Sequence, residues 1–199
     1  MFWFEPPSQL IGWDYNASEI LDDTHIEFIE DYVSKNRFFL RKAQVQTGTD
    51  VPYDDSYRRS DIFFFTDFQS TKIIYEQIYN AVIEINSNHF KYSICYIEPL
   101  QYSVYKEEVV GFYNVHCDSH LRNTSGFIRK ISFSILLNDP SEFEGGKLLF
   151  HTEKEPIEAK LEKKGDMVLF PSFIPHSVSP VTKGIRKTLV GWICGPNLV

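Results

Sequence analysis

Residues 165–193 read GDMVLFPSFIPHSVSPVTKGIRKTLVGWI, and this stretch decides the fold class. It contains two short runs of strand-forming residues, Met167–Phe170 and Lys187–Ile193, set among glycine, proline and lysine-glycine turn signals. The pattern therefore predicts short strands joined by tight connections.

The same strand pattern extends upstream to about residue 89. Apolar or aromatic residues alternate there with polar ones, and Lys147–Phe150 forms a further short run. The alternating apolar positions are Phe90, Tyr92, Ile94, Tyr96, Ile131, Phe133, Ile135 and Leu137. An aromatic content of 16% also favours strands over a helical bundle.

The part of the chain before residue 89 has helical periodicity instead. Apolar residues recur at helical spacing from Ser18 to about Lys35, and again from about Ser70 to Asn86. Asp61–Phe65 between them predicts a short buried strand. Residues 41–60 are polar and rich in turn residues, so we expect a long exposed loop that can hold an embedded strand.

Helices followed by a run of antiparallel strands predict an α+β, mainly β protein. The expected architecture is a double-sheet jelly roll with supporting N-terminal helices. We expect one domain over residues 1–199, with helical support at about 18–86 and the jelly-roll core at about 89–199. Such a fold brings strands that are distant in sequence side by side.

The composition limits the classes of partner. The net charge of −7 argues against a general nucleic-acid binder, which needs a basic face to neutralise phosphates. No apolar window approaches a membrane span, and residues 1–7 lack the basic and apolar regions of a signal peptide. The three cysteines have no CxxC spacing, so we expect a reducing, cytoplasmic location.

Three residues form a candidate metal site. His116 and Asp118 flank Cys117 and, as alternate strand residues, lie on one face, whereas Cys117 points away. His176 is expected to supply the third ligand. Two histidines and a carboxylate form the facial triad of non-haem Fe(II) oxygenases, although such a set also holds Zn or Mn.

His120 is an internal rival to His176 because it shares the face of His116 and Asp118. Three ligands on one extended strand spread over roughly 13 Å, too far to share one ion. We therefore favour His176 and expect His120 at the rim of the site or exposed. The other histidines, His25, His89 and His151, lack comparable partners and are expected to be surface or core residues.

Arg186 indicates which small molecule accompanies the metal. A tight turn over residues 180–184 would place Arg186 on a strand beside His176, with Thr188 on the same face. A guanidinium there suits the far carboxylate of a bidentate 2-oxo acid. The residues thus predict an oxygenase with a dicarboxylate co-substrate.

The stretch from Tyr105 to Gly195 resembles the catalytic core of the Fe(II)/2-oxoglutarate-dependent oxygenases, in particular the prolyl 4-hydroxylase-like group. The resemblance rests on the segments GFYNVHCDS (111–119), LLND (136–139), FEGG (143–146), GDMVLFPSF (165–173), HSVSPV (176–181) and GIR (184–186). They occur in the family's order, and the stretch from Tyr105 to Gly195 that contains them covers about half of the chain.

The resemblance implies roles for individual residues. His116, Asp118 and His176 would hold Fe(II), and Arg186 with Thr188 would bind the 5-carboxylate of 2-oxoglutarate. Tyr105 and Tyr113 stand where the family often has tyrosines near the co-substrate, although plain core packing is as good an explanation. Trp192 either walls the pocket or fills the core, Lys187 points away from the site, and Gly145-Gly146 is a structural turn.

The resemblance also implies the reaction. Substrate hydroxylation would be coupled to O2 consumption and to decarboxylation of 2-oxoglutarate to succinate and CO2, with ascorbate as reductant. The favoured substrate is a prolyl residue in a peptide or protein. Nucleic-acid demethylases of the family carry a second arginine where this chain has Trp192. A free amino acid or small metabolite, a non-catalytic binding module and a Zn or Mn protein without 2-oxoglutarate stay open.

Two segments are candidates for the substrate cleft, and solvated loops are an equal alternative for both. The first is the 41–60 loop and the second is the 119–129 segment. Their candidate residues are Tyr53, Tyr57, Arg58, Arg59, Arg122 and Arg129.

Overall fold

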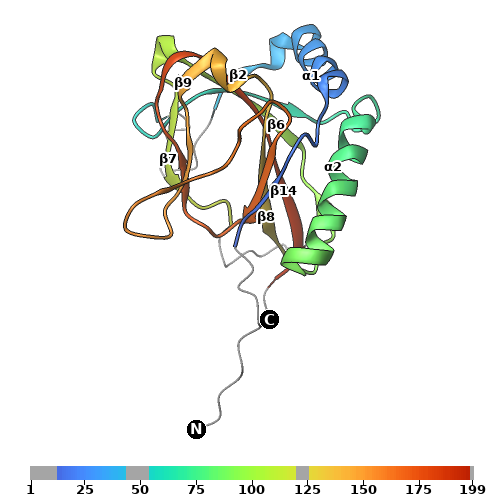
Figure 1. The fold of residues 1–199 in the computed structure, drawn as a ribbon. Helices are drawn as coiled ribbons and strands as arrows, with labels where there is room; N and C mark the ends of the chain where they lie inside the picture. Colours follow the sequence, from blue (N-terminus) through green and yellow to red (C-terminus); the bar gives the residue numbers. More distant parts are fainter. Residues whose placement is uncertain (1–12, 44–53, 120–125, 198–199) are drawn as a thin grey trace.

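The computed structural model describes residues 13–43, 54–119 and 126–197, and Figure 1 shows their arrangement. Two antiparallel sheets form the body of the protein. Both helices lie on one side of it (Figure 1). Among the described residues, none of the helices has the length and apolar character needed to cross a bilayer.

The larger sheet has nine strands, in the order β1-β12-β8-β14-β6-β4-β2, with β5 and β9 also paired to β14. Its strands are β1 (Tyr15–Ala17), β2 (Arg41–Lys42), β4 (Asp61–Phe65), β5 (Tyr96–Ile97), β6 (Leu100–Lys106), β8 (Phe127–Leu136), β9 (Phe143–Gly145), β12 (Met167–Pro171) and β14 (Val181–Pro196). The long strand β14 lies at the centre, between β8 and β6.

The smaller sheet has five strands in the order β11-β10-β13-β7-β3. They are β3 (Arg58–Arg59), β7 (Phe112–His116), β10 (Leu148–Phe150), β11 (Ile157–Glu158) and β13 (His176–Val178). All recorded pairings in both sheets are antiparallel.

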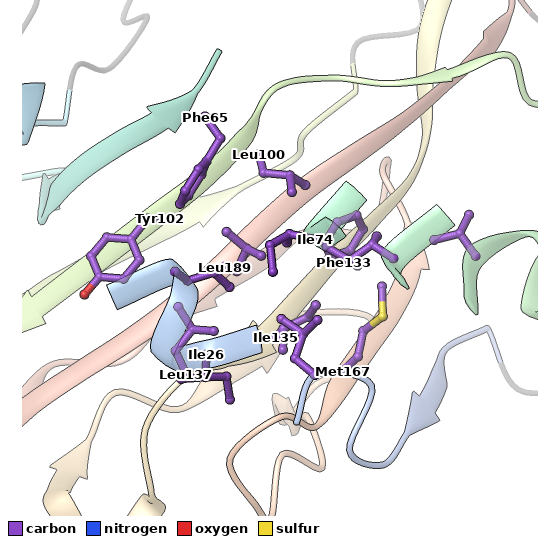
Figure 2. Packing of buried hydrophobic residues seen from close by; sticks show 14 of the residues in the cluster. Ile26, Phe65, Ile74, Leu100, Tyr102, Phe133, Ile135, Leu137, Met167 and Leu189 are labelled. Atoms are coloured by element: carbon purple, nitrogen blue, oxygen red, sulfur yellow. The ribbon is translucent and has the colours of Figure 1, made fainter. Parts of the chain in front are cut away.

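The helices α1 (Asp23–Lys35) and α2 (Lys72–Ile85) cover the outer face of the larger sheet. Each buries a stripe at helical spacing: Ile26, Ile29 and Val33 from α1, and Ile74, Ile78, Val82 and Ile85 from α2. Both stripes belong to one buried cluster with Phe133, Ile135 and Leu189 of the sheet. Figure 2 shows Ile26 of α1 and Ile74 of α2 within it. Burial of this apolar face stabilises the larger sheet.

A second core lies between the two sheets. It includes Phe150, Val168, Phe170 and Val178. Along β14 the side chains alternate: Leu189 and Ile193 face the helices, whereas the even-numbered positions face the space between the sheets.

Most expected elements are confirmed with small shifts at their ends. Asp61–Phe65 is β4, and the second helix is close to its expected bounds. The first helix begins at Asp23 rather than Ser18, because Asp22 caps it by accepting the His25 N–H at 2.9 Å. Three-residue 3-10 helices also occur, at Arg37–Phe39, Glu107–Val109 and Pro140–Glu142.

The strand expected over Phe90–Tyr96 is wrong. Asn86–Phe90 is a π-helical turn, Lys91 is left-handed with φ 57°, and strand β5 begins only at Tyr96. The cause is Asn86, whose side-chain amide pairs with the backbone N–H and C=O of Tyr92 at 3.0 Å each. Those backbone groups therefore have no need of a sheet partner.

The expected pairing of Arg186 with His176 on neighbouring strands is also wrong. β13 lies in the smaller sheet and β14 in the larger one. The chain crosses at Ser179-Pro180, after which Val181 pairs with Gly145. His176 and Arg186 therefore belong to opposite sheets and both line the cavity between them.

Candidate metal and co-substrate site

The structure brings His116, Asp118 and His176 together between the sheets. His116 ends β7, His176 begins β13, and the two are direct cross-strand partners. Asp118 follows just beyond β7. One potential ligand atom from each residue lies within 4.8 Å of the other two. Among the residues described, this is the one such cluster of three or more histidine, cysteine or acidic residues.

Backbone carbonyls orient both imidazoles. His116 Nδ1 lies 2.8 Å from the Asn114 carbonyl oxygen, and His176 Nδ1 lies 2.9 Å from that of Ile174. A donor at Nδ1 leaves the Nε2 lone pair free. The Nε2 atoms lie 3.7 and 3.5 Å from the Asp118 carboxylate oxygens. Histidines that ligate metals are held in this way.

The Asp118 carboxylate is held from the larger sheet. Ser132 of β8 donates a 2.7 Å hydrogen bond to Oδ2 of Asp118, and the Ser132 and Ser172 hydroxyls lie 2.9 Å apart. The Asp118 N–H donates to the Ser172 carbonyl oxygen at 2.9 Å. These bonds fix the carboxylate at the side of the two imidazoles.

The protonation states also suit a metal. Burial, then the neighbouring His176, lowers the pKa of His116 to about 4, which keeps its imidazole neutral. Burial alone would raise the pKa of Asp118, but His176, His116 and Ser132 outweigh it and hold the pKa below its usual value. The Trp192 indole N–H contributes in the same direction, although it falls short of a hydrogen bond in geometry. A neutral imidazole and an ionised carboxylate are the forms that bind metals.

This donor set fits Fe(II). Two imidazoles and a carboxylate converge on one point, as in the facial triad that leaves coordination positions open. Neither Cys117 nor any other thiol joins the cluster within the described part of the chain. Two nitrogen donors and one oxygen donor without sulfur match non-haem iron better than a structural zinc site.

Arg186 lies in the same cavity with only 3% of its surface exposed. Its guanidinium carbon lies 5.8 Å from the Tyr105 ring centroid, and no carboxylate of the described residues lies within 4.0 Å of it. Burial lowers its pKa to about 10, so it stays protonated at neutral pH. A buried cation of this kind needs an anionic ligand.

The residues expected around Arg186 are present in the cavity wall. Thr188, 1% exposed, follows Arg186 on the same face of β14, and Trp192 lies further along. Tyr105 is buried and pairs with Arg186 across β6 and β14. Tyr113 stacks on His116 with ring centroids 3.6 Å apart, and burial raises its pKa to about 12. Lys187 points away, as expected, and binds Glu30 of α1 at 2.7 Å.

Gly146 lies against the Arg186 side chain. It has φ 61°, and a Cβ at this position would lie 2.7 Å from Cδ of Arg186 and 2.9 Å from Cγ2 of Val181. The absence of a side chain at Gly146 therefore leaves room for the methylene groups of Arg186, in addition to permitting the turn.

The cavity has a volume of about 650 Å³, within the usual range for small-molecule sites. Its wall contains the triad and five alternate residues of β14: Arg186, Thr188, Val190, Trp192 and Cys194. At one side Arg129 pairs with Glu98 at 2.6 Å and lies 3.9 Å from the Trp192 ring. The Cys194 thiol lies 3.2 Å from the same carboxylate.

The described residues include part of each candidate substrate segment. Tyr57, Arg58 and Arg129 line the cavity, whereas Arg59 does not and instead donates to the Asp55 carbonyl oxygen at 2.8 Å. Tyr53, His120 and Arg122 lie outside the described residues. Of the remaining histidines, His25 is bonded to Asp22, His151 to Ser177, and His89 packs on Phe90.

Sequence reasoning missed Ser132, Glu98 and the burial of Arg58. Ser132 and Ser134 alternate with Ile131, Phe133 and Ile135, and this run of small polar residues on one strand face is a signal that could have indicated a polar interior. Nothing in the sequence around Glu98 or Arg58 indicates their positions.

Comparison with known proteins is consistent with this geometry. Residues 100–194 match the 2OG-Fe(II) oxygenase superfamily. A PKHD-type hydroxylase of Prochlorococcus marinus is 40% identical over 81 residues, which are 41% of this chain and 35% of that protein. One from Thermosynechococcus vestitus is 37% identical over 99 residues, 49% of this chain and 43% of that protein. The chain thus matches less than half the length of these relatives.

Solved structures show the same fold. A prolyl-4-hydroxylase from Pseudomonas putida superposes with a TM-score of 0.70 at 17% identity, over 92% of both chains. The viral collagen prolyl hydroxylase of Paramecium Bursaria Chlorella virus-1, solved as a 2OG complex, gives 0.69 at 18% identity over 92% of this chain and 97% of that one. These likenesses confirm the predicted jelly roll with supporting helices.

Proposed function

We propose, because residues 100–194 match the 2OG-Fe(II) oxygenase superfamily, that this protein is an Fe(II)- and 2-oxoglutarate-dependent hydroxylase. The proposed substrate is a prolyl residue in a peptide or protein, and the products are hydroxylated substrate, succinate and CO2. One observation carries the proposal: a two-histidine, one-carboxylate cluster shares one cavity with a buried guanidinium, that of Arg186, which has no carboxylate partner among the described residues.

The prolyl substrate is supported by the relatives. The matching structures include a prolyl hydroxylase from Trichoplax adhaerens in complex with a peptide fragment of hypoxia inducible factor, with a TM-score of 0.71 at 16% identity over 91% of this chain and 83% of that one. The cavity wall includes the aromatic side chains of Tyr57, Tyr113 and Trp192, against which a five-membered ring can pack. We further propose that helices and jelly roll act as one domain.

In this proposal His116, Asp118 and His176 hold Fe(II) from one side. Bound Fe(II) with 2-oxoglutarate supplies the O2-dependent oxidation that decarboxylates the co-substrate and hydroxylates a substrate C–H bond. Ser132 keeps the carboxylate in place, and the Asn114 and Ile174 carbonyls keep each Nε2 unprotonated. Ascorbate is the proposed reductant.

The proposed role of Arg186 is to bind the 5-carboxylate of 2-oxoglutarate. Its burial makes the ion pair strong, because little water competes for the guanidinium. The Thr188 hydroxyl can donate to the same carboxylate, and the Tyr105 phenol lies on the neighbouring strand. The apolar wall, including Phe170 and Val178, excludes water from the reacting groups.

The test is succinate formation from 2-oxoglutarate with Fe(II), ascorbate and O2, with and without a panel of proline-containing peptides. We expect turnover that a peptide stimulates and that His176→Ala abolishes. Arg186→Ala is expected to raise the 2-oxoglutarate concentration required, with iron binding retained. Iron-dependent activity that survives in Asp118→Ala would contradict the assignment of the triad.

A control variant separates loss of iron from loss of fold. His151 lies close to the smaller sheet but binds Ser177 instead of joining the cluster. We expect His151→Ala to retain Fe(II) binding and 2-oxoglutarate turnover. Wild-type protein that binds Fe(II) but shows neither turnover nor 2-oxoglutarate binding would favour a metal-binding module without this chemistry.

A further inference from the structure

Arg58 is a second buried guanidinium in the cavity wall. It lies on β3, only 6% of it is exposed, and its Nε donates to the Ser60 hydroxyl at 2.8 Å. The guanidinium carbon lies 4.3 Å from the Tyr113 ring centroid, and Arg58 pairs with Tyr113 across β3 and β7. These contacts fix the side chain, and its terminal nitrogens form no hydrogen bond with any residue that the structure describes.

The anion for Arg58 is missing among the described residues. No carboxylate in that part of the protein lies within 4.0 Å of its guanidinium. Arg129 in the same wall differs, because Glu98 neutralises it. An arginine with only 6% of its surface exposed and no anion beside it favours an anionic ligand.

With the metal and 2-oxoglutarate bound as proposed, every charge in the described cavity wall except that of Arg58 has an opposite charge to balance it. A divalent metal exceeds the charge of Asp118 by one, and Arg186 adds another positive charge. The two carboxylates of 2-oxoglutarate offset both, and Glu98 offsets Arg129. Arg58 is then the one charged residue of the described cavity wall without a counter-charge.

Arg58 lies beside the metal-ligand cluster, on the sheet opposite to the one that carries Arg186. The Tyr113 ring contacts both Arg58 and His116, so one aromatic ring connects the guanidinium to the metal-ligand cluster. Arg186 lies instead on the opposite sheet. A group bound by Arg58 would therefore belong to a molecule that reaches the metal from the side of β3 and β7.

We propose that Arg58 binds a carboxylate of the substrate and that the enzyme selects anionic substrates. This inference rests on the proposed function and specifies its substrate class. A neutral amide carbonyl could accept a hydrogen bond from Arg58 but would leave the buried positive charge without compensation. The carboxylate comes either from the hydroxylated residue itself, as in a free imino acid, or from an acidic residue beside it in a peptide.

The experiment compares matched acids and amides by calorimetry on protein loaded with Mn(II) and 2-oxoglutarate. One pair is N-acetyl-L-proline and N-acetyl-L-prolinamide, and the other is acetyl-Glu-Pro-amide and acetyl-Gln-Pro-amide. We expect wild-type protein to bind the acid of at least one pair about tenfold or more tightly than its amide. The pair that shows the preference identifies the source of the carboxylate.

The preference should depend on Arg58 alone. We expect Arg58→Gln to bind acid and amide equally, Arg58→Lys to keep part of the preference, and the neighbouring Arg59→Gln to keep all of it, because Arg59 does not line the cavity. Because the acid and amide are also compared on wild-type protein, a folding defect in one variant cannot decide the result.

Three results would overturn the inference. They are equal binding of acid and amide by wild-type protein or binding of neither, an undiminished preference in Arg58→Gln, and a large loss of 2-oxoglutarate affinity in Arg58→Gln. Wild-type protein that binds 2-oxoglutarate without discriminating acid from amide would refute this inference while the proposed function stands. Wild-type protein that binds no 2-oxoglutarate would refute the proposed function itself.

Discussion

Ser132 of the larger sheet donates a 2.7 Å hydrogen bond to the carboxylate of Asp118, which follows a strand of the smaller sheet. This bond connects the two sheets at the metal-ligand cluster. Ser132 is fully buried, and Ser172 is its second partner. The position of one ligand therefore depends on a side chain that does not itself face the metal.

Replacing Ser132 is expected to weaken metal binding. Ser132→Ala removes the hydrogen bond that holds Asp118, and loss of such an outer partner typically lowers metal affinity by about 10- to 100-fold. A calorimetric titration with Mn(II) measures the change in metal affinity. Ser134→Ala is the matched control, because Ser134 lies on the same face of β8 and has no recorded bond to the cluster. Wild-type Mn(II) affinity in Ser132→Ala would refute this role.

Gly146→Ala is expected to weaken 2-oxoglutarate binding while metal binding persists. The new Cβ would lie 2.7 Å from Cδ of Arg186 and would push the guanidinium from its place. The φ of 61° adds a strain of roughly 1–2 kcal/mol. We expect about a tenfold rise in the dissociation constant of 2-oxoglutarate, measured by calorimetry in the presence of Mn(II).

Gly126→Ala separates the strain from the contact. Gly126 also has a positive φ, of 82°, but a Cβ there meets nothing within 4 Å. This control should lose a similar amount of stability and keep its 2-oxoglutarate affinity. Equal affinity in both variants would show that Gly146 does not position Arg186.

Residue alternation explains how much of the site was predictable from sequence. A strand turns every second side chain to one face, so Arg186, Thr188 and Trp192 were correctly expected together. Lys187 was correctly expected on the other face. The expected third ligand, His176, does lie beside His116 and Asp118. Strand alternation does not explain this part of the site, because β7 ends at His116, Asp118 lies beyond it, and Cys117, expected to point away, also lines the cavity.

The connections between strands were less predictable. Residues 180–184 look like a hairpin turn, yet the chain crosses there from one sheet to the other. Local turn chemistry does not tell which strand is the next partner, because the pairing of Val181 with Gly145 depends on a distant segment. In the same way, the side-chain amide of Asn86 forms the hydrogen bonds with the Tyr92 backbone that a neighbouring strand was expected to form.

Arg58 shows that the burial of a single charged residue is hard to predict from sequence. Its surroundings in the sequence are polar and turn-rich, which predicts exposure. The structure buries it because β3 pairs with β7 and Tyr113 covers the guanidinium. Burial of a charge is decided by partners that are distant in sequence, so a composition-based argument fails for it.

The stability of the larger sheet is expected to depend on α2. Ile78 is fully buried against the sheet, whereas the next residue, Tyr79, is 54% exposed. Ile78→Ala is expected to lower the free energy of unfolding by about 2–5 kcal/mol, because it leaves a cavity between helix and sheet. Tyr79→Ala should change it by less than about 1 kcal/mol. Urea unfolding of both variants measures the difference, and equal losses would contradict the assigned packing.

Metal binding is expected to stabilise the folded protein. The ligands come from the end of β7, the residue beyond it and the start of β13, and they converge only in the folded state. Mn(II) at about 100 times its dissociation constant should therefore raise the free energy of unfolding by about 2.7 kcal/mol. Thermal unfolding with and without Mn(II) measures this, and a chelator should reverse it. His176→Ala should abolish the shift and His151→Ala should keep it, since His151 lies outside the cluster. A shift that persists in His176→Ala would place the metal elsewhere.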